Sequence, residues 1–272
     1  MFRTYTAIAL ALGLIAATVP LAQAESFRWA GTTDPQTMDP HAVNSAPVLG
    51  FLNNVYEGLV RRGKDMTIEP ALATAWEVIG DGEGWRFTLR EGVKFHDGSD
   101  FTAEDVLFSY QRASDEASDT RSWFAPVSDV QVVDDFTVDI MTTAPNPIFP
   151  DSIANWMIMD SGWAEANDAT LPDKETGNYA TLNANGTGAF KVTAREPGLR
   201  TVLEPHADWW GEVEHNITQA EFTPIQNPAT AVAAPLSGHV DRINPVPLQA
   251  AARPEGRGDG QVSRGHQARG LI

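Results

Sequence analysis

The stretch that decides the fold runs from 85 to 98 and reads WRFTLREGVKFHDG, with TAEDV following at 102–106. Its apolar residues Trp85, Phe87 and Leu89 alternate with polar ones, which predicts a strand with one buried face. The threonine that opens the second stretch precedes two acidic residues. This order predicts a helix start, because carboxylates are favoured near the positive end of a helix. Most of this stretch is therefore expected to be scaffold, and its histidine is not assigned a catalytic role.

Working outward, helices and strands are interspersed along the rest of the chain, which predicts a mixed α/β fold. Alternating apolar residues and turn signals predict strands at 26–30, 129–133, 136–141, 189–194, 200–204 and 220–224. Apolar residues at helical spacing, helix caps and proline positions predict helices at 45–60, 102–113, 147–157 and 228–236.

Charge and cysteine content exclude several function classes. The 272 residues include 36 acidic and 19 basic ones, giving a formal net charge of -17. A nucleic-acid or anionic-lipid partner needs a basic face, so neither is expected. The absence of cysteine removes disulfides, thiolate catalysis and Cys-ligated metals. The six histidines show no metal-ligand spacing, so no metal or other cofactor is expected.

Residues 1–24 have the pattern of an export signal. Arg3 gives the positive end, an apolar run follows, and Ala22-Gln23-Ala24 is a small-x-small cleavage site. The mature chain is expected to begin at Glu25 and to be exported, either to the periplasm or to the exterior.

No catalytic motif is evident. The chain has neither a G-x-S-x-G elbow nor a phosphate-binding loop. A carboxylate pair of the kind used in glycoside hydrolysis is compatible with the many acidic residues, so a secreted hydrolase stays open as an alternative. The eight tryptophans suit either core packing or a ligand pocket. Trp29, Trp76 and Trp85 favour the core, whereas Trp123 and Trp156 fit both.

Several segments occur in an order that resembles a known family. The segments are MDPH at 38–41, YEGLVR at 56–61, PALATAWE at 70–77, the 85–106 block, GTGAF at 186–190 and DWWG at 208–211. Together they resemble the family 5 extracellular solute-binding proteins, which are the dipeptide-, oligopeptide- and nickel-binding components of ABC importers. The resemblance covers nearly all of 26–249.

The resemblance implies a two-lobed clamshell of the periplasmic-binding-protein type II (cluster C) class, with ligand enclosed between the lobes. It implies a monomer that binds peptides or similar small solutes, performs no chemistry on them and delivers them to an ABC permease in the inner membrane. Family members hold peptide partly as an added β-strand. The solute could be a peptide, a nickel chelate, an opine or a sugar.

The resemblance also implies where ligand contacts lie. The segment after the first strand faces the cleft in the family, which here assigns ligand binding to Thr37, Met38 and Asp39. The side-chain pocket of the family corresponds to Trp123 and Phe124, and the helix after Pro147 adds two further candidates, Asn155 and Trp156.

The chain departs from the family pattern at its end. Family members are much longer, and their second lobe would follow position 249. The sequence therefore predicts a signal peptide at 1–24, the N-terminal lobe at 25–249 and a disordered Gly/Arg-rich tail at 250–272. A C-terminally truncated chain is expected to bind ligand weakly, and a non-functional product of a broken gene is a further alternative.

Overall fold

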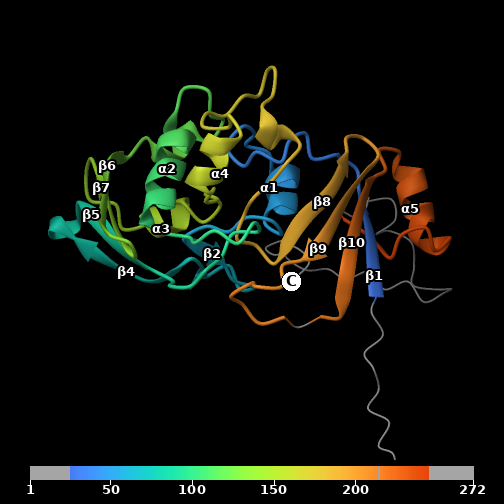
Figure 1. Cartoon of the computed structure of the whole chain (residues 1–272), viewed down its shortest axis with the longest axis horizontal. Coiled ribbons are helices and arrows are strands. Elements are labelled where there is room, and N and C mark those ends of the chain that lie inside the picture. The colour runs from blue at the N-terminus through green and yellow to red at the C-terminus, as the bar shows by residue number, and fades with distance from the viewer. Residues whose placement is uncertain (1–24, 214, 245–272) are drawn as a thin grey trace, which may run out of the picture.

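The computed structural model describes residues 25–213 and 215–244 (Figure 1). Its strands are β1 (Glu25–Gly31), β2 (Val60–Arg62), β3 (Ile68–Pro70), β4 (Ala73–Ile79), β5 (Gly84–Leu89), β6 (Val127–Asp134), β7 (Thr137–Thr142), β8 (Phe190–Glu196), β9 (Arg200–Pro205), β10 (Ile217–Pro224) and β11 (Arg242–Ile243). Its α-helices are α1 (Ala46–Leu52), α2 (Ala103–Ser114), α3 (Phe149–Ser152), α4 (Ser161–Ala166) and α5 (Pro228–Leu236). Three short 3-10 helices cover Gly80–Gly82, Arg121–Phe124 and Tyr179–Thr181.

A five-stranded mixed sheet forms one half of the described molecule, with the strand order β11-β1-β10-β9-β8. β1 pairs in parallel with both β10 and β11, whereas β10, β9 and β8 are antiparallel neighbours. Helix α1 covers one face of this sheet, where Phe51 contacts Trp29 and Phe222 at ring distances of 6.0 and 5.4 Å. On the opposite face, Ala30 packs with Ala234 of α5 and with Val240, and Arg28 is ion-paired with Asp241.

A four-stranded antiparallel sheet, with the order β4-β5-β7-β6, forms the other half (Figure 1). The predicted buried face of β5 is confirmed, because Phe87 is 0% exposed and packs in the same core as Val106 of α2. Arg86 projects from the other face and forms an ion pair with Asp139 of β7. The helix start is confirmed too, since the Asp105 carboxylate accepts a hydrogen bond from the backbone N–H of Thr102.

Two predicted helices are wrong in length. The helix expected over 45–60 ends at Leu52, because Asn53 and Asn54 follow and Gly58 then leads the chain into β2. The apolar side chains beyond the helix, such as Val55 and Leu59, are still fully buried. Their helical spacing therefore reflects the packing of an irregular segment into the core and not a longer helix. The helix expected over 147–157 is a single turn, α3, and the chain then runs irregularly to Asp160.

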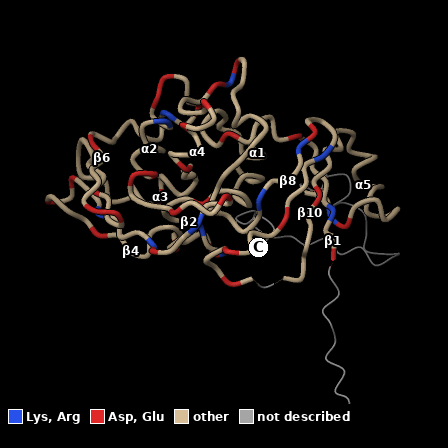
Figure 2. The backbone as a smooth tube through the Cα atoms, in the orientation of Figure 1, with Lys and Arg blue, Asp and Glu red and all other residues tan. Residues whose placement is uncertain are grey.

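Acidic residues are spread along both halves of the described chain (Figure 2). Among the helices of the described residues, none is long and apolar enough to cross a membrane. The predicted export signal and the tail at 250–272 lie outside the described residues.

Candidate functional site

The parallel strands of the five-stranded sheet end together at one edge. The chain leaves β1 after Gly31, β10 after Pro224 and β11 after Ile243. Backbone hydrogen bonds hold these ends in register, from Ile225 N–H to the carbonyl of Gly31 (2.7 Å) and from Asn244 N–H to that of Ala30 (2.8 Å). In open α/β sheets, ligands bind in the crevice outside the carboxyl ends of parallel strands. This carboxyl edge, comprising residues 32–41, 225–227 and 244, is therefore the candidate site.

The edge offers exposed polar groups beside a fixed backbone. Thr33 and Gln226 are exposed, and Thr32 is half-buried. Asp34 is ion-paired with Arg195 of β8 and accepts the backbone N–H of Gly198, which ties the segment after β1 to the β8–β9 hairpin.

The three predicted ligand residues after β1 point into the protein. Thr37, Met38 and Asp39 are 5%, 0% and 1% exposed. The backbone N–H of Met38 donates to the carbonyl of Thr181, and that of Asp39 donates to Thr37 Oγ1. Their hydrogen-bonding groups are thus engaged within the lobe.

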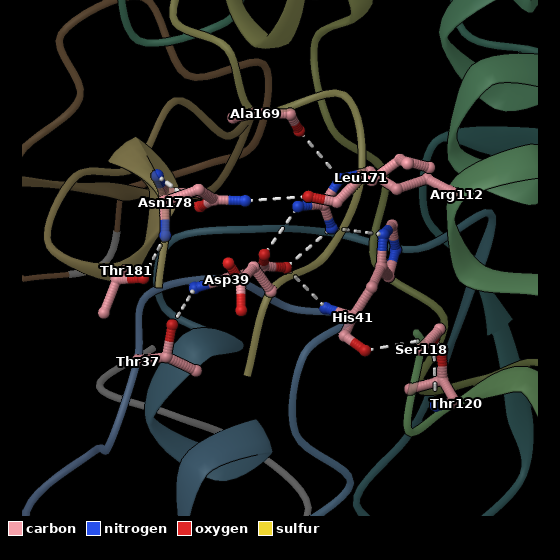
Figure 3. Close-up of polar contacts among 12 residues, drawn as sticks. Thr37, Asp39, His41, Arg112, Ser118, Thr120, Ala169, Leu171, Asn178 and Thr181 are labelled. Carbon is pink, nitrogen blue, oxygen red and sulfur yellow. Dashed lines mark hydrogen bonds and ion pairs between the residues drawn. The ribbon is translucent and has the colours of Figure 1, made fainter. Parts of the chain in front are cut away.

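Asp39 anchors a buried polar network, hereafter the Arg112 network, which consists of Thr37, Asp39, His41 and Arg112 (Figure 3). Arg112 of α2 donates from Nη1 and Nη2 to the two carboxylate oxygens of Asp39, at 2.6 and 2.5 Å. Its Nε donates to the carbonyl of Ala169 at 3.0 Å. The ion pair is 0% and 1% exposed, so two opposite charges are removed from water together.

The protonation states of the network follow from its contacts. Burial favours a raised pKa for Asp39, but the hydrogen bonds and charge of Arg112 outweigh it and leave that pKa below its ordinary value. Burial, then the charge of Arg112, lowers the pKa of His41 to about 3. His41 is therefore neutral: Nδ1 accepts from Arg112 and Nε2 donates to the carbonyl of Met157 at 2.9 Å. The network holds the segment 37–41 against α2.

The four remaining predicted residues lie in the other half of the molecule. Phe124 and Trp156 meet edge to face with ring centroids 5.0 Å apart, and both are buried, at 4% and 0% exposed. Trp123 is half-buried and packs against both main cores, whereas Asn155 is exposed. The structure thus brings Phe124 and Trp156 together.

The charged groups beneath the edge are paired with each other, and the described residues contain no group of three or more His, Asp or Glu side chains that could hold a metal ion. Pattern reasoning missed Thr33, Gln226 and Arg112. The strand ends could have indicated the first two, whereas nothing local links Arg112 to a partner 73 residues away.

Comparison with known proteins identifies the scaffold. The family model described as "Bacterial extracellular solute-binding proteins, family 5 Middle" matches residues 67–271. The chain is 26% identical over 229 residues to the periplasmic murein peptide-binding protein MppA of Escherichia coli, covering 76% of this chain and 41% of that protein. It is 27% identical over 268 residues to the periplasmic oligopeptide-binding protein OppA of Salmonella typhimurium, covering 90% and 48%.

A solved structure agrees in fold. The periplasmic binding protein AgaA from Agrobacterium tumefaciens R10, in complex with agropinic acid, matches with a TM-score of 0.75 and 25% identity, covering 84% of this chain and 45% of that one. The chain spans less than half the length of these relatives. The family match and the two sheets confirm the predicted periplasmic-binding-protein-like α/β fold as a partial clamshell. The chain belongs to the bacterial extracellular solute-binding proteins of family 5.

Proposed function

We propose that this chain supplies one wall of a periplasmic binding site for peptides or similar small solutes, which are then delivered to an ABC permease in the inner membrane. The observation that carries the proposal is the carboxyl edge of the parallel strands, where exposed Thr33 and Gln226 flank backbone held by the hydrogen bond from Ile225 N–H to the carbonyl of Gly31. Family membership supports binding rather than catalysis, because the relatives are solute-binding proteins.

The solute class rests on the relatives. MppA and OppA are named for murein peptides and oligopeptides, which favours a peptide, whereas AgaA binds agropinic acid on the same scaffold. The periplasmic compartment and the cleaved signal at 1–24 belong to the proposal as well, as do a monomeric state and the permease partner. The relatives that are named periplasmic support the compartment.

The seven predicted ligand residues take two roles in this proposal. Asn155 and Trp123 have exposed or half-buried side chains, but they lie in the other half of the molecule, so they would touch only a solute that extends beyond the carboxyl edge. The five buried ones, Thr37, Met38, Asp39, Phe124 and Trp156, set the backbone and the packing behind it.

A thermal-shift screen of residues 25–272 tests the proposal, using dipeptides, tripeptides, longer peptides, opines, sugars and nickel chelates. A ligand at 100 times its Kd adds about 2.7 kcal/mol to the free energy of unfolding. We expect peptides to raise the melting temperature only at millimolar concentration, because the described lobe provides a single wall for an enclosed ligand.

A matched pair of variants locates the effect. Gln226→Ala at the carboxyl edge is expected to reduce the peptide-induced shift, whereas Gln111→Ala, exposed on α2, leaves it unchanged. A shift that both variants retain in full would contradict the placement of the site. No shift with any class at millimolar concentration would contradict solute binding by this chain.

A further inference from the structure

A second polar cluster lies outside the carboxyl edge, around Glu57 in the connection between α1 and β2. Three side chains donate hydrogen bonds to its carboxylate. Thr187 Oγ1 and Trp210 Nε1 reach Oε2 at 3.0 and 2.8 Å, and Trp209 Nε1 reaches Oε1 at 3.3 Å. We call Glu57, Thr187, Trp209 and Trp210 the Glu57 cluster.

The cluster joins segments that are far apart in the sequence. Thr187 lies in a turn that packs directly on the α1–β2 connection, where Gly188 N–H donates to the carbonyl of Val55 at 2.9 Å. Trp209 and Trp210 belong to the loop 206–211 that leads from β9 towards β10. The contacts of Glu57 with the two indoles therefore fasten this loop to the body of the lobe.

A further contact supports the same loop from the four-stranded sheet. The Arg90 guanidinium lies 3.9 Å from the centroid of the Trp210 ring, and Arg90 Nε donates to the carbonyl of Ala71 at 3.2 Å. Trp210 is thus held on its face by a cation and at its edge by the Glu57 carboxylate. Trp209 has the longer hydrogen bond to Glu57 and is the more easily released.

All three side-chain partners can donate to the ionised carboxylate. The Thr187 hydroxyl can also accept, so a proton on Oε2 can be donated to Thr187 Oγ1 while Trp209 Nε1 still donates to Oε1. Ionisation instead places a charge at a buried site, which favours a packing that lets water reach the carboxylate. Burial raises the pKa of Glu57 to about 7, against the opposing hydrogen bonds from Trp210, Thr187 and Trp209 and the charge of Arg61. The change of state therefore falls near neutral pH.

We propose that the Glu57 cluster is a proton-sensitive latch, in which the protonated carboxyl keeps the loop 206–211 packed against the lobe and the ionised carboxylate, which is more stable in contact with water, releases Trp209. The latch is independent of the proposed solute site. In this proposal the pH selects between two arrangements of the loop 206–211. This loop precedes β10, and the other end of β10 lies at the carboxyl edge.

Other titratable groups near the loop change charge at lower pH. His96 and His206 meet edge to face with ring centroids 4.9 Å apart. Burial lowers the pKa of His96 to about 4, and it also lowers the pKa of His206, where the charge of Asp208 opposes it and that of Lys191 adds to it. The nearby cations are Arg61 and Arg90.

Tryptophan fluorescence between pH 5 and 9 tests the latch in the chain 25–272. We expect a reversible transition near pH 7 that Glu57→Gln abolishes. Thr187→Val removes one donor to the ionised carboxylate, so it is expected to raise the midpoint by about one pH unit. Glu91→Gln, at an exposed position, and His206→Asn are the controls and should leave the transition in place.

Three results would overturn the latch. They are the absence of a transition in the unmodified chain, its persistence in Glu57→Gln, and its loss in His206→Asn. If Glu57→Gln does not fold, the midpoint in Thr187→Val decides, and an unchanged midpoint refutes the assignment to Glu57. Peptide binding plays no part in these readings, so they stand apart from the test of solute binding.

Discussion

At the scale of single residues, Arg112 and Asp39 fix the segment that leaves β1. Both are almost completely buried, and Arg112 donates to Asp39, His41 and Ala169. Removing one member of a buried ion pair leaves the other charge without compensation, which typically costs about 3–5 kcal/mol. Arg112→Met is therefore expected to lower the free energy of unfolding by that amount.

Urea unfolding at pH 7 measures this loss, with Arg62→Met as the matched control. Arg62 forms an ion pair with Asp151 at 2.8 Å, but the two side chains are 29% and 50% exposed, so the control is expected to cost less than about 1 kcal/mol. Equal losses in the two variants would show that the Arg112 network does not stabilise the lobe.

The raised pKa of Glu57 predicts an unusual dependence of the free energy of unfolding on pH. Its pKa rises from the ordinary value of 4.5 to about 7 on folding, so the folded chain retains a proton that the unfolded chain releases. The stability contributed by this group is greatest below pH 4.5 and falls as the pH rises to 7, by about 3 kcal/mol in all. His41, whose pKa falls on folding to about 3, acts in the opposite sense below pH 6.5.

The difference between Glu57→Gln and the unmodified chain isolates the Glu57 contribution. We expect this difference in unfolding free energy to grow by about 3 kcal/mol in favour of the variant between pH 4.5 and 8. A difference that does not change with pH would mean that Glu57 titrates at its ordinary value in the folded protein.

At the scale of elements, local patterns predicted most strands and half of the helices. The strands at 26–30 and 220–224, the 129–141 hairpin and the helix at 228–236 are confirmed as parts of β1, β10, the β6–β7 pair and α5. Each has alternation, a cap or a turn residue of its own. The strands β2, β3, β4 and β11 and the helix α4 were missed. Three of these strands have only two or three residues, and β4 has mostly exposed or half-buried side chains, so none shows a clear alternation of apolar residues.

The site was harder to predict than the fold. The segment after β1 was identified through resemblance, but its burial depends on Arg112 and on Thr181, which lie far along the chain. A sequence pattern does not show which side of such a segment faces the interior. The assignment of Thr37, Met38 and Asp39 to ligand contact stays a prediction.

The turn at Gly186 and Gly188 shows how closely two elements meet. A Cβ at Gly186 would lie 2.0 Å from the carbonyl oxygen of Val55, and one at Gly188 would lie 2.6 Å from the Val55 carbonyl carbon. Gly186→Ala is expected to destabilise the protein by at least about 2 kcal/mol, because the backbones must separate. Thermal and urea unfolding measure the loss.

Gly50, within α1, is the matched control. Nothing lies within 4 Å of a Cβ placed there, so Gly50→Ala is expected to stabilise the helix by about 0.5–1 kcal/mol. If Gly186→Ala is tolerated as well as Gly50→Ala, the close approach of the turn to Val55 is not rigid.

At the scale of the whole molecule, the two largest hydrophobic cores of the described residues lie next to each other. One core lies between the four-stranded sheet and α2, and the other lies between the five-stranded sheet and α1, while Trp123 packs against both. The Arg112 network also joins the halves, because α2 contributes Arg112 and the segment after β1 contributes Asp39. We expect the described lobe to unfold cooperatively as one unit and to present the carboxyl edge as a rigid surface.

An amide chemical-shift map of the labelled chain 25–272, titrated with a tripeptide to millimolar concentration, tests most directly whether the carboxyl edge receives a peptide. We predict saturable shifts concentrated at residues 32–41, 225–227 and 244, with few changes around β4 and β6. Shifts concentrated elsewhere, or none at millimolar peptide in a chain that is folded by the same spectrum, would contradict the claim that the carboxyl edge receives a peptide.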